Sequence, residues 1–129
     1  MPAPTTFNYA TVRVVPRVDR DEFVNAGVIV YSAEMRFLDA RIEVNEARLK
    51  ALWPSLDVDT VKKHLHAIRL ICEGDPAGGA IARLPQKDRF HWLTSPRSAV
   101  IQISPVRTGI SATPKELLEH LADELVGVG

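Results

Sequence analysis

The spacing of apolar residues changes near residue 44, and that change constrains the fold more than any other feature. Apolar and polar residues alternate over residues 10–14 and 38–43, as in Ala10, Val12 and Val14, whereas over residues 45–72 apolar residues recur at spacings of three and four. A period of two is typical of half-buried strands, and the longer spacing is typical of amphipathic helices. The sequence therefore predicts a three-stranded meander over residues 8–43, followed by helices.

The second strand of this meander is predicted to lie near the middle of the sheet. Residues 23–31 read FVNAGVIVY and are apolar on both faces, as in strands covered on both sides. Gly27 within them predicts a bulge or the close approach of another backbone. Residues 32–34 predict a short hairpin connection. Residues 1–7 contain two prolines and predict a loose N-terminal arm.

Capping residues indicate where the helices begin. Asn45 is predicted to cap a short helix that ends before Pro54, and Asp57 to cap a longer one that closes at Gly74 in a left-handed conformation. The buried stripe of the longer helix is predicted to comprise Val58, Val61, Leu65, Ile68 and Cys72. Thr113 starts a capping box that predicts a last helix, ending near Gly127. The inward stripe of this last helix is predicted to comprise Leu117, Leu118, Leu121 and Leu125.

The segment between these helices is harder to assign. Residues 73–88 hold three glycines and two prolines, so they predict a long surface loop. Residues 89–94 and 99–103 are then interpreted as two strands of a hairpin, although Phe90 and Leu93 are three apart and a helix over residues 86–93 is the alternative. We predict one α+β domain over residues 1–129. Its sheet has four or five mostly antiparallel strands, the meander plus the C-terminal hairpin, packed against about three helices.

Composition excludes several classes of function. Sixteen basic residues balance sixteen acidic ones, which argues against nonspecific nucleic-acid binding. The single cysteine, Cys72, allows no disulfide within the chain and is interpreted as a buried thiol. The four histidines form no recognisable metal-ligand set, and we expect no cofactor. Neither a membrane span nor a secretory signal is visible, which favours a cytoplasmic protein.

Two arginines beside hydroxyl groups are the candidates for anion binding. Arg97 lies between Ser95 and Ser98, and Arg107 precedes Thr108. If residues 97–107 run extended at roughly 3.3 Å per residue, the two arginines lie about 30 Å apart and cannot hold one small anion together. The alternative is that these polar groups only satisfy turn backbone.

A second polar segment precedes the central strand. Asp21 and Glu22 could serve as acid–base carboxylates or magnesium ligands, but their spacing favours a solvated loop with weak ion pairs. Asn25 is expected to hydrogen-bond nearby backbone beside Gly27. Trp53, Phe90 and Trp92 are interpreted as core residues.

Three segments resemble a bacterial family known as domain of unknown function 3037. They are YATVRVVP with the following RDEFVNAGVIVY, RFHWLTSPRSAVIQISPVRTG, and TPKELLEHL. The resemblance implies no established activity, cofactor or catalytic residue. Its members are often encoded beside a HipA-like serine/threonine kinase protein, which implies a small partner or regulator, as in a toxin–antitoxin pair. The positions that would mark a shared surface are Arg17, Glu22, Asn25, Arg97, Ser98, Gln102 and Arg107.

Two functions are therefore expected as alternatives. The first is a non-catalytic accessory domain that binds another protein, such as a HipA-like kinase. The second is a small-anion or nucleotide-binding domain, or a weak phosphate-handling enzyme, that uses Arg97, Ser98 and Arg107. Zero net charge and an exposed edge strand also favour a homodimer.

Overall fold

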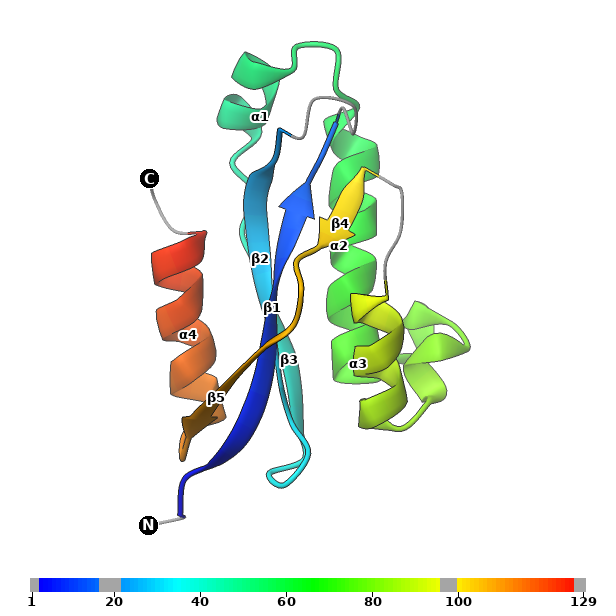
Figure 1. Ribbon diagram of the computed structural model, residues 1–129. Helices are drawn as coiled ribbons and strands as arrows, with labels where there is room; N and C mark the ends of the chain where they lie inside the picture. Colours follow the sequence, from blue (N-terminus) through cyan, green and yellow to red (C-terminus); the bar gives the residue numbers. More distant parts are fainter. Residues whose placement is uncertain (1–2, 17–21, 96–99, 127–129) are drawn as a thin grey trace.

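Five antiparallel strands form one open sheet. The computed structural model describes residues 3–16, 22–95 and 100–126. The strands are β1 (Thr5–Val14), β2 (Val24–Ser32), β3 (Phe37–Ile42), β4 (Ile101–Ile103) and β5 (Arg107–Ser111). Their order is β3-β2-β1-β4, and β5 also pairs with β1 (Figure 1). The α+β class and the predicted meander of the first three strands are confirmed.

Strands β4 and β5 lie one after the other along the same edge of β1 (Figure 1). Pro105 lies between them and has no backbone N–H to continue the ladder. The Ser104 side chain bridges the break, because its Oγ accepts the Thr11 N–H at 2.8 Å while its own N–H donates to the Thr11 carbonyl at 2.9 Å. The hairpin predicted over residues 89–94 and 99–103 is therefore wrong, since β4 pairs with β1 and residues 89–94 supply no strand.

Residues 89–94 form helix rather than strand, so the preferred prediction for them is wrong. They belong to α3 (Gln86–Thr94). Phe90 and Leu93 are buried on one side of this helix, and the Phe90 ring stacks on Tyr31 with centroids 5.0 Å apart. The alternative prediction of a helix over residues 86–93, which the spacing of three between these residues suggests, is confirmed.

The remaining helices begin close to where their caps predict. They are α1 (Glu46–Leu52), α2 (Val58–Glu73) and α4 (Pro114–Leu125). Asn45 and Asp57 accept hydrogen bonds from the first turns of α1 and α2, and Gly74 ends α2 with a φ of 71°. The capping box at Thr113 is only half right, because the helix starts there but the Thr113 side chain makes no capping bond. The expected loop over residues 73–88 contains two short 3-10 helices, η2 (Pro76–Gly78) and η3 (Ile81–Arg83).

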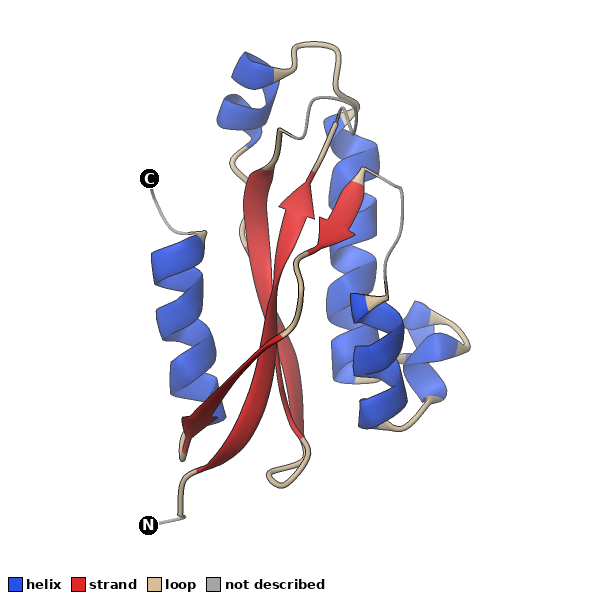
Figure 2. Ribbon diagram, viewed as in Figure 1, coloured by secondary structure: helices blue, strands red, loops and turns tan. Residues whose placement is uncertain are grey.

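Helices cover both faces of the sheet, unevenly (Figure 2). On one side α2 and α3 pack on a large cluster that includes Val12, Val14, Ile29 and Leu65. On the other side α4 packs on a much smaller cluster. The buried members of this smaller cluster are Phe7, Val28, Val30 and Leu118. We call the second side the α4 face.

Two local features of the strands matter below. The N-terminal arm predicted over residues 1–7 is strand from Thr5 onward, and Phe7 is buried there. The register of β1 and β2 shifts between Val12 and Arg13, so that Val12 pairs with Gly27 but Arg13 pairs with Asn25. The bulge predicted near Gly27 is thus confirmed, and Ala26 is the extra residue.

Candidate functional site

The bulge in β2 places Asn25 beside Arg13 on the α4 face. In a regular strand, residues two apart share a face, so Asn25 would lie on the same side as Gly27. The bulge at Ala26 reverses this and turns Asn25 to the α4 face. Arg13 in turn pairs with Gln102 of β4. Asn25, Arg13 and Gln102 therefore form a row of polar residues across three neighbouring strands, which we call the polar row.

A small hollow lies beside this row, next to the end of α4. Its volume is about 150 Å³. Two arginines, Arg13 and Arg107, line it, and no described lining residue is acidic. Its walls comprise Tyr9, Thr11, Arg13, Asn25, Ser104, Pro105, Arg107 and Leu125. The hollow is thus a basic site built from β1, β2, the β4–β5 break and α4.

Arg13 and Asn25 each hold one atom without a hydrogen-bond partner among the described residues. The Asn25 Nδ2 donates to the Leu125 carbonyl at 2.9 Å, which fixes the amide and leaves its buried Oδ1 unbonded. The buried Arg13 Nε is likewise unbonded. Leaving such a group unsatisfied costs roughly 1–3 kcal/mol. A donor and an acceptor thus lie on neighbouring strands, both unpaired.

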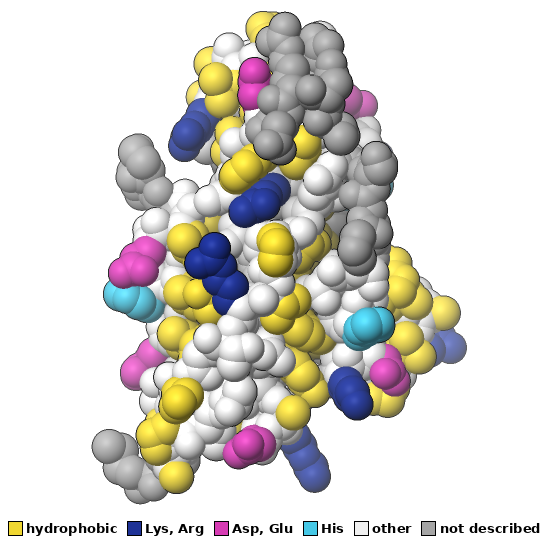
Figure 3. All heavy atoms as spheres, in the orientation of Figure 1, with side chains coloured by type: hydrophobic (Ala, Val, Ile, Leu, Met, Phe, Trp, Pro, Cys, Tyr) yellow, Lys and Arg dark blue, Asp and Glu magenta, His cyan; other side chains and the backbone are white. Residues whose placement is uncertain are grey.

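Apolar side chains surround this polar centre on the surface. Phe23 is 43% exposed and carries the Arg13 guanidinium over its ring at 4.2 Å from the centroid. Val106 is 44% exposed and Leu125 is 37% exposed. Figure 3 shows this face, with basic side chains near its middle and hydrophobic ones around them. We call Phe23, Val106 and Leu125 the apolar rim.

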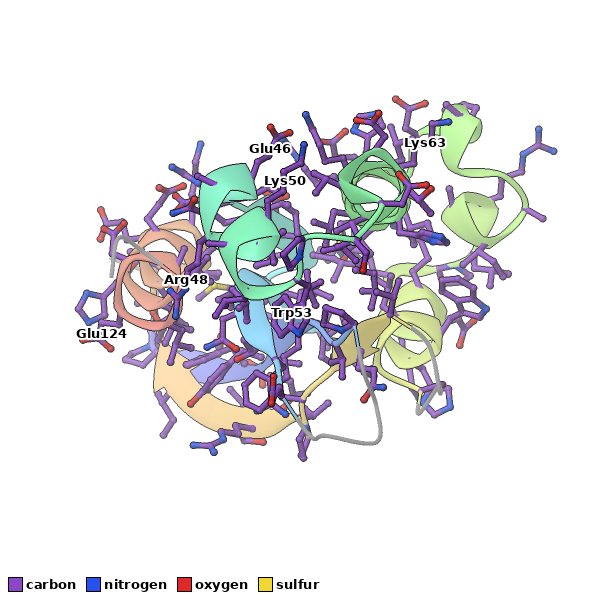
Figure 4. All side chains as sticks on the ribbon, turned by 90° about the horizontal axis from the view of Figure 1, so that it is seen from above. Glu46, Arg48, Lys50, Trp53, Lys63 and Glu124 are labelled. Atoms are coloured by element: carbon purple, nitrogen blue, oxygen red, sulfur yellow. The ribbon has the colours of Figure 1, made fainter. Side chains whose placement is uncertain are left out.

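A larger hollow of about 550 Å³ adjoins the first, and Asn25 lines both. It lies between α1, the ends of β2 and β3, and Val126. Seen from above in Figure 4, Arg48 lies between α1 and α4, with Glu46 on the opposite side of α1. Glu46 is held by Lys62 at 2.6 Å, and this hydrogen bond lowers the pKa of its carboxyl. Glu46 lines the hollow, and its carboxylate is paired with Lys62 of α2.

The structure brings together some of the predicted site residues. Asn25 and Arg107 meet in the small hollow, and Gln102 joins them through the polar row. Glu22 precedes the rim residue Phe23 and is exposed. Arg17, Arg97 and Ser98 lie outside the described residues. Asn25 binds the end of α4 rather than nearby backbone, so that expectation is wrong.

Sequence reasoning missed Arg13, the residue at the centre of the site. The signal was present, because Tyr9, Thr11 and Arg13 alternate with the apolar residues of β1 and all share one face. The alternation alone does not say what covers that face, and in the structure α4 and the β4–β5 break lie beside it. Whether this face is exposed or covered depends on the position of α4, and the local sequence pattern does not contain that position.

The remaining predictions concern a reactive thiol, a metal site, the tryptophans and a membrane span. Burial raises the pKa of the Cys72 thiol to about 12, as the prediction of a buried thiol requires. The described residues contain no group of three or more His, Cys, Asp or Glu side chains placed to bind a metal. Trp92 is 37% exposed, so its assignment to the core is wrong. None of the helices in the described ranges has the length and apolarity to span a membrane.

Fold and site together define a class: an α+β domain with an open antiparallel sheet and a basic hollow beside its last helix. Residues 9–126 match the profile of a protein family of unknown function, DUF3037, and the chain belongs to that family. The resemblance drawn from the sequence is confirmed. No curated protein and no solved structure matches the chain.

Proposed function

We propose that this domain binds a segment of another protein at the α4 face, through the small hollow and the apolar rim. The observation that carries the proposal is the unpaired donor and acceptor of Arg13 and Asn25. A peptide group offers both a carbonyl for Arg13 Nε and an N–H for Asn25 Oδ1. A fully ionised phosphate or carboxylate offers acceptors alone and would leave the Asn25 oxygen unbonded.

The apolar rim supports a protein partner. Protein interfaces combine buried aromatic and aliphatic anchors with a few well-placed arginines, and energy concentrates where water is excluded. Phe23 and Leu125 provide such anchors next to Arg13. Both unpaired atoms are shielded from solvent, so a partner must displace a rim side chain to reach them. Pairing them on binding recovers the cost of leaving them unsatisfied.

The partner we infer is a cytoplasmic protein, and the HipA-like kinase often encoded beside family members is the first to test. Calorimetry with the purified domain and that protein measures the affinity directly. Arg13→Met should weaken binding at least tenfold, because a hydrogen bond to a charged group contributes about 1.5–3 kcal/mol. Asn25→Leu should weaken binding by removing the acceptor.

The control is Arg83→Met, which removes an exposed arginine on η3, outside both hollows. Its affinity should equal that of the wild type. No binding of the kinase would reject this partner, and binding that is unaffected by Arg13→Met and Asn25→Leu would reject the site.

A second candidate function is small-anion binding, and the placement of Arg13 and Arg107 in one hollow favours it. The 150 Å³ volume suits a phosphate group but is below the roughly 300–1,000 Å³ of typical small-molecule sites, so a nucleoside would extend outside. A ligand at one hundred times its Kd adds about 2.7 kcal/mol to the free energy of unfolding. Thermal shifts with inorganic phosphate and nucleotides that disappear in Arg107→Met would establish this function, and no shift with any of them would exclude it.

A further inference from the structure

The two edges of the sheet differ in whether nearby side chains block them. One edge is β3, and the other is formed by β4 and β5. An unpaired edge carries backbone N–H and C=O groups that can pair with another chain, and proteins commonly block such edges.

The β3 edge is blocked. Glu43 N–H donates to the Ala26 carbonyl of β2, so by alternation the Ala40 N–H points away from β2. The Asp39 carboxylate accepts that N–H at 2.8 Å and so occupies a position that an added strand would need. Arg41 is fixed to Glu119 of α4 at 2.6 Å and to Glu43 at 3.3 Å. Charged side chains therefore protect this edge.

The β5 edge has no comparable protection. Among the described strands β5 pairs with β1 alone, and its single charged residue is Arg107, at the end of the strand. Ile110 is 74% exposed, more than any other large hydrophobic residue in the described ranges. Its cross-strand partner Thr6 is also exposed. An exposed apolar side chain on an open strand is the arrangement expected of an edge that another strand covers.

We propose that β5 pairs with β5 of a second copy of this chain, antiparallel, with the twofold axis at Gly109. In this register Thr108 lies opposite Ile110 of the second copy, and Arg107 lies opposite Ser111. The two Ile110 side chains become diagonal neighbours on one face, within reach of each other. The two sheets then form one continuous sheet.

Charge is compatible with a second copy at this edge. The chain has no net charge, so two copies do not repel each other at long range. The proposed register sets no like charges opposite one another, because the two Arg107 residues lie on either side of the axis at opposite ends of the paired segment. A twofold arrangement also uses one surface twice, as most homodimers do.

Sedimentation equilibrium from 10 to 200 µM protein tests this dimer without any other partner, so its outcome is independent of the proposed function. The wild type should be dimeric at the upper end of this range, and Ile110→Lys should be monomeric. Ile110 is largely exposed, so circular dichroism should show the variant folded. Leu84→Lys, at an exposed site between η3 and α3, is the control and should remain dimeric.

Hydrogen exchange provides a second readout. The amides of β5 should become better protected as protein concentration rises, while those of β3 should not change. A wild type that stays monomeric at 200 µM overturns the proposal. So does a dimer that survives Ile110→Lys.

Discussion

At the scale of single residues, the close approach of the Phe7 ring decides which residue can occupy position 109. Gly109 pairs with Phe7, and the Phe7 ring covers it so closely that a Cβ built on Gly109 would lie 2.3 Å from the ring. Only glycine leaves room for this aromatic side chain, which belongs to the small cluster beneath α4. The requirement is steric rather than conformational.

We therefore expect Gly109→Ala to destabilise the protein by about 1–3 kcal/mol, the usual cost of overpacking. Urea denaturation measures this change in the free energy of unfolding. Thr108→Ser, which keeps the hydroxyl of an exposed neighbour, should stay within about 0.5 kcal/mol of the wild type. Equal stability of Gly109→Ala and wild type would mean that the Phe7 ring moves freely.

Cys72 should be inert in the folded protein. Burial, chiefly, raises its pKa to about 12, and nearby Asp39 adds to the effect, so almost no thiolate exists at pH 8. Ellman's reagent should label it only after unfolding. Lys63→Cys in a Cys72→Ala background places a thiol on the exposed side of α2 and should react at once. Comparable rates at the two positions would show that α2 opens readily.

At the scale of elements, caps were predictable and pairing partners were not. Asn45, Asp57 and Gly74 act within a few residues of themselves, so local pattern located α1 and α2 correctly. The segment around Phe90 has no cap, since Pro85 offers no side-chain acceptor at the start of α3. Its helical state depends on burial of Phe90 against Tyr31, a contact between distant parts of the chain.

The N-terminal cap of α2 should make the stability of the protein depend on pH. Hydrogen bonds from the Thr60 hydroxyl and backbone N–H lower the pKa of Asp57 below its ordinary value of 3.8. Because the folded-state pKa is lowered, the stabilisation is complete above pH 3.8 and is lost as the pH falls through the folded-state value.

Asp57→Asn keeps a good cap but cannot titrate. The difference in Tm between wild type and Asp57→Asn should therefore shift against the wild type as the pH falls from 5 to 2.5. Thermal melts across this range measure it. A difference in Tm that stays constant with pH would show that the Asp57 carboxylate has the same pKa in the folded and unfolded protein.

At the scale of the whole molecule, the two layers of helices should differ in stability. The cluster beneath α4 is much smaller than the one shared by α2 and α3. Local opening is easiest where few apolar side chains are buried. We expect the amides of α4 to exchange hydrogen faster than those of α2.

Native-state hydrogen exchange measures this difference. Leu118→Ala, which removes the buried α4 residue of that cluster, should accelerate exchange in α4 and leave α2 little changed. Uniform protection across both helices would mean that the domain opens only as a unit. Opening of α4 would also free the Leu125 carbonyl from Asn25 and so alter the proposed binding site.

The site itself could be predicted only in part. Arg107 was a candidate because hydroxyl groups lie near it in the sequence, and Asn25 and Gln102 were candidates because their segments resemble the family. Arg13 was not, because an arginine on a polar strand face usually points to solvent. What makes it different is the convergence of the Ala26 bulge, the break at Pro105 and the end of α4. Each of these is set by tertiary pairing, which a single sequence does not display.

The pairing of β1 with β4 and β5 has a consequence for how the protein is made. Strand β1 leaves the ribosome before β4 and β5, so it finds its partners on that side only after residues 101–111 have emerged, since Thr5 pairs with Ser111. Contacts so distant in sequence slow folding, and a nascent strand left open on that side is prone to wrong partners. Synthesis of this domain should therefore be sensitive to chaperone supply at the moment when residues beyond 100 appear.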